Sequence, residues 1–214
     1  MKRDRFLLLG ALIQFALLAL LTRWTREHRL SLRDILVSRY MQKKEPSGLQ
    51  SLVLGLNRLI GSASSVNMLA LPFAALLWAF RLRVEAVITM LMCWIGGLTQ
   101  HFIKQAIDRP RPSPLVIRVT KSARGKSFPS GDVAASVMLW GWLLCIGIWK
   151  RRELSRRQVA LLSLPASSIA FIGPARVYLG DHWTTDVLGG YLFGGGWLSL
   201  TLYLYRRLGR RYGE

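Results

Sequence analysis

Six apolar segments, each close to the length needed to cross a bilayer, constrain the fold of this 214-residue chain more than any other feature. A membrane-spanning helix needs about 20 mostly apolar residues, because the hydrocarbon core offers no partner to unpaired backbone amides. The pattern predicts an all-α polytopic membrane protein, a six-transmembrane-helix bundle that forms one domain over residues 1–214. The predicted spans are residues 6–21, 65–80, 84–102, 133–149, 159–174 and 187–205.

The chain is strongly basic, with 30 Lys and Arg against 11 Asp and Glu and a net charge of +19 at pH 7. In a soluble protein this excess would suggest nucleic-acid binding. Here the charges lie between apolar segments, in blocks such as KRRELSRR, where cytoplasmic anchoring and anionic lipid headgroups explain them. We therefore expect the lipid bilayer as the partner, and no nucleic acid.

The even number of spans places both chain ends on one side of the membrane. The density of Lys and Arg near the helix ends favours the cytoplasm for that side, in a cytoplasmic (inner) membrane. The most polar loops, KQAIDRPRPSP, KSFPSGD and ARVYLGDHWTTD, then share the extracytoplasmic side. Residues 23–50 fit an amphipathic helix in the membrane interface and a solvated loop equally well.

These loops carry the residue types that bind a phosphoryl group. Lys104, Arg111 and Arg176 supply three positive charges, and an arginine offers a planar fork for two phosphate oxygens. Ser130 and Gly131 lie in a tight turn before a predicted helix, whose first backbone N–H groups would point at an anion. We therefore expect an anion site where the loops meet.

His182 and Asp186 supply a nucleophile and its partner. They are four residues apart, so on a helical turn they share one face. The carboxylate can then hold one ring nitrogen while the other stays free, as in nucleophilic triads.

In order and spacing, these residues resemble the three-part signature of the type 2 phosphatidic acid phosphatase superfamily. The signature occupies residues 104–112, 129–132 and 175–186. The resemblance implies a phosphatase for lipid phosphates or diphosphates that uses no metal and no cofactor. It implies a membrane lipid phosphate as substrate and is compatible with a homo-oligomer.

The resemblance also implies a role for each residue. His182 attacks phosphorus and becomes a phosphohistidine, while Asp186 orients its ring. The phosphoryl oxygens are held by Lys104, Arg111, Ser130, Gly131 and Arg176.

The chain departs from the family pattern at Asp132, where the family has a histidine that protonates the leaving group. An ionised Asp132 could pair with Arg111 or Lys104 and leave an impaired, lipid-binding relative. Burial beside His182 could instead let Asp132 act as the catalytic acid. The third reading, which we favour, is a polyprenyl (undecaprenyl) diphosphate substrate, whose leaving phosphate needs a proton less than an alkoxide does. Phosphatidic acid and phosphatidylglycerophosphate are the alternatives.

Several neighbouring residues match no signature position. Arg109, Asp108 and Asp181 receive no role, and His101 is interpreted as structural. The glycines at 189, 190 and 194–196 are interpreted as close helix packing. The cationic loop 113–126 is a candidate gate over the site.

Overall fold

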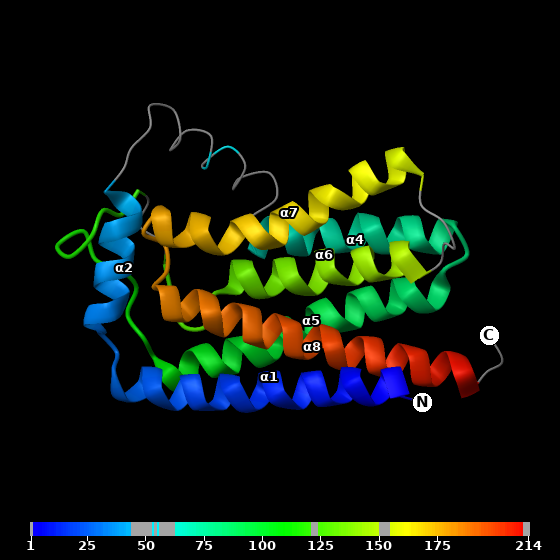
Figure 1. The fold of residues 1–214 in the computed structure, drawn as a ribbon, viewed down its shortest axis with the longest axis horizontal. Helices are drawn as coiled ribbons and strands as arrows, with labels where there is room; N and C mark the ends of the chain where they lie inside the picture. Colours follow the sequence, from blue (N-terminus) through cyan, green and yellow to red (C-terminus); the bar gives the residue numbers. More distant parts are fainter. Residues whose placement is uncertain are drawn as a thin grey trace.

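The computed structural model describes residues 2–43, 53, 55, 63–120, 124–149 and 155–211, and within these ranges the regular structure is entirely helical. The all-α prediction is therefore confirmed for this part of the chain. All helices but α2 run along the long axis of the molecule, whereas α2 lies across one end (Figure 1). The helices are α1 (Lys2–Glu27), α2 (Leu32–Gln42), α4 (Ala63–Ala79), α5 (Arg83–Ile107), α6 (Gly131–Trp149), α7 (Arg156–Tyr178) and α8 (Thr184–Arg211).

Among the described residues, four helices are long and apolar enough to cross a membrane, namely Asp4–Glu27, Arg83–Ile107, Gly131–Trp149 and Thr184–Gly209. They contain the first, third, fourth and sixth predicted segments. The second segment forms α4, which has only 17 residues, and the fifth lies in α7, which contains two prolines and three serines. The chain is thus a membrane protein, but the count of six spans is not confirmed. Membrane crossing by α4 and α7 stays a prediction.

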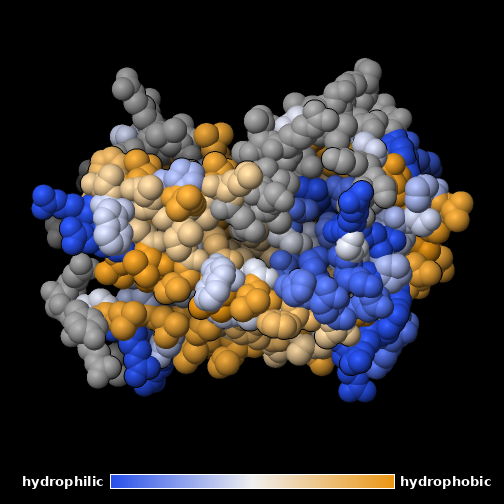
Figure 2. Space-filling view, turned by 180° about the vertical axis from the view of Figure 1, so that it is seen from behind, coloured by the Kyte–Doolittle hydropathy of each residue, from blue (hydrophilic) through white to orange (hydrophobic). Residues whose placement is uncertain are grey.

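The surface agrees with a bilayer location. A belt of hydrophobic residues occupies the middle of the molecule, and hydrophilic residues gather at its two ends (Figure 2). Many large apolar side chains are exposed on this surface, as hydrocarbon surroundings permit. They include Leu20 (66% exposed), Met68 (78%), Trp94 (69%) and Phe102 (63%).

Helix α6 forms the centre of the bundle, because it packs against α4, α5, α7 and α8. Glycines on α8 make the close approach to α6 possible. A Cβ atom at Gly190 would lie 2.8 Å from the Ser130 carbonyl oxygen, and one at Gly194 would lie 2.8 Å from that of Ala134. Glycines 189, 195 and 196 also face neighbouring side chains at short range, so the packing interpretation of this group is confirmed.

The segment predicted as an interfacial helix or a loop is divided between two helices. Helix α1 continues to Glu27, and α2 follows as a separate helix, while residues 44–50 lie outside the described part of the chain. Asp34 and Ser38 of α2 are buried. Its exposed side chains include Leu32, Leu36 and Tyr40. Helix α2 therefore turns polar groups inward and apolar groups outward, an arrangement suited to a lipid surface.

Candidate active site

The ends of four helices meet at the end of the bundle that α2 crosses (Figure 1). The last turns of α5 and α7 carry Lys104 and Arg176, and the first turns of α6 and α8 carry Asp132 and Asp186. Gly180 turns the chain between α7 and α8 with a φ of +73°, a conformation that favours glycine. The alternation of helix and loop in the sequence thus brings the three polar loops together.

His182 lies buried at the centre of this cluster, with 1% of its surface exposed. Its Nδ1 atom is 3.6 Å from Oδ2 of Asp186 and 3.5 Å from Oγ of Ser127. The Ser127 hydroxyl donates a hydrogen bond to the same Asp186 oxygen, which also accepts one from the Trp183 backbone N–H at 2.9 Å. Ser127 is a neighbour of both partners that the sequence analysis did not consider.

The other ring nitrogen of His182 faces a cation and an acid. Nη1 of Arg111 lies 3.3 Å from Nε2, and Oδ2 of Asp132 lies 3.9 Å from it. A guanidinium can only donate, so Nε2 must be the acceptor and the ring proton sits on Nδ1. This tautomer suits a ring oriented through Nδ1 by Asp186 and reacting through Nε2.

Asp132 forms an ion pair with Arg176, whose Nε lies 3.1 Å from Oδ2. The partners suggested by the sequence were Arg111 and Lys104, and Arg176 was not among them. Nη1 of Arg176 also donates to Asp181 at 2.7 Å, so Asp181 belongs to the cluster although it received no role from the sequence. The Asp132 carboxylate thus lies between the Arg176 guanidinium and the Nε2 atom of His182.

Two cations tether the loop before α6. Nζ of Lys104 donates to the Lys126 carbonyl oxygen at 3.0 Å. Arg111 donates through Nε to the Gly125 carbonyl at 3.2 Å and through Nη1 to the Asp181 carbonyl at 2.8 Å. Residues 121–123 of the candidate gate lie outside the described part of the chain.

Ser130 and Gly131 lie at the junction with α6. Ser130 is fully buried, and its backbone N–H donates to the Asp186 carbonyl at 2.9 Å. That amide therefore holds α6 against α8 and does not point at an anion. The Ser130 hydroxyl makes no hydrogen bond within the described residues.

Arg109 received no role from the sequence, but it is fully buried beside the site. Its Nη1 lies 2.6 Å from Oδ1 of Asp186, and its Nη2 lies 2.7 Å from Oδ2 of Asp34 on α2. Removing one partner from a buried ion pair typically costs about 3–5 kcal/mol, since the other charge is left without compensation. Arg109 therefore fixes Asp186 and α2 to one another.

The protonation of the site follows from its burial. Burial lowers the pKa of His182 below its usual range, and Arg111 and Lys104 act in the same direction, against the opposing effect of Asp186. The imidazole is therefore neutral at pH 7 and has a lone pair available. Burial also lowers the pKa of Arg111, although nearby carboxylates oppose the change.

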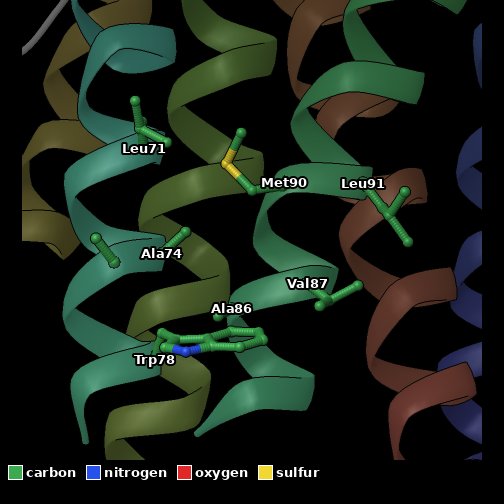
Figure 3. Close-up of a pocket in the computed structure, with 8 residues that line it drawn as sticks. Leu71, Ala74, Trp78, Ala86, Val87, Met90 and Leu91 are labelled. Atoms are coloured by element: carbon green, nitrogen blue, oxygen red, sulfur yellow. The ribbon is translucent and has the colours of Figure 1, made fainter.

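An apolar groove on the bundle surface, about 340 Å³ in volume, lies between α4 and α5. Leu71, Ala74 and Trp78 face it from α4, while Val87 and Met90 face it from α5 (Figure 3). No lining side chain is charged, so this groove has no groups for phosphate chemistry. Within the described ranges no group of three or more His, Cys, Asp or Glu residues could hold a metal ion.

Comparison with known proteins gives consistent matches. A family model for the PAP2 superfamily matches residues 85–210. Phosphatidylglycerophosphatase B of Bacillus subtilis (strain 168) is 26% identical over 137 residues, which are 63% of this chain and 65% of that protein. The aligned region thus spans less than two thirds of the curated relative.

Two solved structures share the fold. One is the first transmembrane PAP2 type phosphatidylglycerolphosphate phosphatase from Bacillus subtilis, with a TM-score of 0.82 at 21% identity, over 94% of this chain and 98% of that one. The other is LpxE of Aquifex aeolicus, with a TM-score of 0.58 at 24% identity, over 77% of this chain and 92% of that one. At these identities the structural matches establish the architecture.

Proposed function

Because the chain belongs to the PAP2 superfamily, we propose that it is a lipid phosphate phosphatase with His182 as its nucleophile. The observation that carries the proposal is the environment of the His182 ring. Nδ1 faces Asp186 at 3.6 Å, and Nε2 faces the Arg111 guanidinium at 3.3 Å. A neutral imidazole with one nitrogen oriented and the other beside a cation is prepared to attack an anionic phosphoryl group.

The proposed reaction has two steps. Nε2 of His182 attacks phosphorus, the bond from phosphorus to the leaving oxygen breaks, and its electron pair departs with that oxygen. Water then attacks the phosphohistidine, releasing inorganic phosphate and restoring the imidazole. Asp186 stabilises the positive charge that the ring acquires. The phosphoryl oxygens are held by Lys104, Arg111, Ser130, Gly131 and Arg176.

Asp132 supports a diphosphate substrate within this class. Asp132 is paired as a carboxylate with Arg176, and a carboxylate has no proton to give to a leaving group. A phosphate monoester has a second pKa of about 6 and departs without prior protonation far more readily than an alkoxide does. A polyprenyl diphosphate such as undecaprenyl diphosphate is therefore the proposed substrate.

A phosphate monoester is the second candidate substrate. Similarity to phosphatidylglycerophosphatase B supports a phosphatidylglycerophosphate headgroup. The leaving alkoxide would then need a proton from Asp132 or from water. For either substrate, we propose a cytoplasmic membrane location with the site on the extracytoplasmic side.

The test is phosphate release by purified protein from farnesyl diphosphate, phosphatidic acid and phosphatidylglycerophosphate, with and without EDTA. We expect release that resists EDTA, is fastest with the diphosphate and disappears in His182→Ala. His101→Ala is the matched control, since His101 is exposed on α5 and should keep full activity.

The alternatives have distinct signatures. A lipid-binding relative would release phosphate from none of these lipids. Activity that survives in His182→Ala would remove the proposed nucleophile. A preference for phosphatidylglycerophosphate over farnesyl diphosphate would favour the monoester substrate over the polyprenyl diphosphate.

A further inference from the structure

We propose that Asp34 of α2 is a positioning residue for the reaction: it holds Arg109 against Asp186 and thereby fixes the carboxylate that orients His182. The kinetic part of this inference rests on the proposed function. Its geometric part rests on a chain of contacts from α2 to the reacting ring.

The contacts around Asp34 are short and buried. Its Oδ2 accepts hydrogen bonds from Nη2 of Arg109 at 2.7 Å and from the Thr185 hydroxyl at 2.7 Å, and its Oδ1 accepts one from the Thr185 backbone N–H at 3.0 Å. Asp34 is 2% exposed and Arg109 is fully buried. Thr185 directly precedes Asp186, so Asp34 grips both the start of α8 and the cation that binds Asp186.

All three nitrogen atoms of the Arg109 guanidinium donate hydrogen bonds. Nε donates to the Arg29 carbonyl at 3.0 Å, Nη1 donates to Thr185 and Asp186 at 2.6 Å each, and Nη2 donates to Asp34. A planar guanidinium held on every side has one orientation. The Asp186 oxygen that it contacts is therefore fixed, and the second oxygen is left to Ser127, the Trp183 amide and the His182 ring.

A buried acid without partners would destabilise the fold, because an isolated charge is costly away from water. The exposed side of α2 carries apolar residues and two arginines, and no other acidic residue occurs in its sequence LRDILVSRYMQ. Packing alone would be served by an apolar residue at 34. The acid is explained by its contacts with Arg109 and Thr185.

The charges in this chain of contacts give Asp34 an electrostatic effect on His182. Two carboxylates and one guanidinium carry a net negative charge, which favours the positive charge that the ring acquires on attack. Replacing Asp34 with asparagine makes the set neutral, so the cationic ring becomes less favourable. The other groups that face His182 are Asp132 of α6, Lys104 of α5, Arg111 and Ser127, and none of them changes in this variant.

The experiment compares Asp34→Asn, Asp34→Glu and Ser38→Ala with wild type in phosphate release. Ser38 is the matched control, since it is buried on the same helix and is not part of the chain of contacts. For Asp34→Asn we expect kcat to fall roughly 10- to 100-fold with KM changed less than about twofold, because a misplaced catalytic group slows the step without weakening binding. The acid limb of the pH profile should move to lower pH. In Asp34→Glu the acid limb should stay at its wild-type pH, and Ser38→Ala should match wild type.

A second readout does not need turnover. The pKa of His182 is measured by NMR in the background His28→Gln and His101→Gln, which leaves one of the three histidines. We expect Asp34→Asn to lower this pKa and Ser38→Ala to leave it unchanged. If wild type hydrolyses no lipid phosphate, the proposed function fails, and the NMR shift still decides whether Asp34 acts on His182.

Two results would overturn the inference. One is an Asp34→Asn enzyme with wild-type kcat and an unchanged His182 pKa. The other is an equal loss of activity in Asp34→Asn and Asp34→Glu while the pKa of His182 stays unchanged. That result would mean that Asp34 serves only the packing of α2. If Asp34→Asn does not purify as a folded protein, Thr185→Val removes the shared hydroxyl instead. That variant should lower kcat with KM kept, and wild-type kcat there counts equally against the inference.

Discussion

At the scale of single residues, the lone pair on Nε2 of His182 is not free at rest, because the Arg111 guanidinium lies 3.3 Å from it. The same guanidinium donates to the carbonyl oxygens of Gly125 and Asp181. A phosphoryl group gives Arg111 a stronger, charged acceptor than any of these. In the proposed reaction, substrate binding therefore draws Arg111 away from the ring and exposes the nucleophile.

The pKa of His182 leads to a prediction on pH. In the proposed reaction the attacking form is the neutral ring, and burial lowers the pKa of His182 below the 6.5 of a free imidazole. The protonated fraction therefore becomes significant only below pH 6.5, and kcat/KM should hold its plateau from neutral pH down past that value. The measurement is a pH profile on a diphosphate and on a monoester, so that ionisation of the substrate can be separated. A midpoint above pH 7 on both substrates would contradict it.

Asp132 leads to a prediction on substrate choice. Asp132→His should raise the rate with phosphatidic acid relative to farnesyl diphosphate, because an imidazolium can protonate an alkoxide leaving group. It also releases Arg176 from its ion pair with the carboxylate. We expect a gain of about tenfold or more in that ratio, since general acid catalysis contributes about 10²–10⁴-fold. An unchanged ratio in a folded variant would mean that the missing acid does not limit monoester cleavage.

The sequence pointed to the candidate site residues that the structure brings together, but it did not point to the residues that support them. His182, Asp186 and the cations were recognisable because catalysis uses few residue types at fixed spacings. Arg109 and Ser127 were not, since their places depend on contacts with Asp186, which lies 77 and 59 residues further along the chain. The available signals were the doubled RPRP and the single acid, Asp34, within the segment LRDILVSRYMQ. Neither signal identifies its partner.

At the scale of helices, the contact between α6 and α8 sets the position of the residues at the start of α6. Gly190 lies against the Ser130 carbonyl and the Val133 side chain, directly behind the start of α6. The amide of Ser130 is bound to the Asp186 carbonyl of α8. Any added volume here pushes the start of α6 away from α8.

Gly190→Ala should therefore cost stability and activity together. The added Cβ would lie 2.8 Å from a backbone oxygen that cannot rotate away, and overpacking of this kind costs about 1–3 kcal/mol. The measurement is the thermal midpoint in detergent together with the rate of phosphate release. Gly97→Ala is the matched control, because nothing lies within 4 Å of a Cβ there. Equal midpoints in the two variants would argue against the packing role.

The helices themselves were predicted with uneven success. Spans near α1, α5, α6 and α8 followed from apolar length alone, since a bilayer imposes that length directly. The division between α1 and α2 was not visible, because the apolar residues of α2 face outward and Asp34 faces inward. The burial of that acid depends on Arg109, 75 residues away.

At the scale of the whole molecule, the hydrophobic belt separates two polar ends (Figure 2). The cluster around His182 lies at one end, with α2 across it, and the turn from α4 to α5 lies at the other (Figure 1). Substrate phosphate and the α4–α5 turn should therefore be on opposite sides of the bilayer.

Labelling of single cysteines in intact cells tests this arrangement. In a background with Cys93 and Cys145 replaced by alanine, Leu115→Cys should react with a membrane-impermeant maleimide, because Leu115 is 95% exposed at the site end. Arg83→Cys, at the other end, should react only after lysis. Reaction of both cysteines in intact cells would exclude the proposed topology, and the reverse pattern would place the site in the cytoplasm.

The tethers of the loop before α6 have a consequence for how this protein can diverge. Lys104 and Arg111 bind carbonyl oxygens of Lys126 and Gly125, not their side chains. Every amino acid supplies that oxygen, so the anchorage survives replacement of Lys126, although Gly125 with its φ of +82° is less replaceable. Substitution at 126 thus changes the partner of Asp108 on this surface while the backbone anchorage of the loop persists.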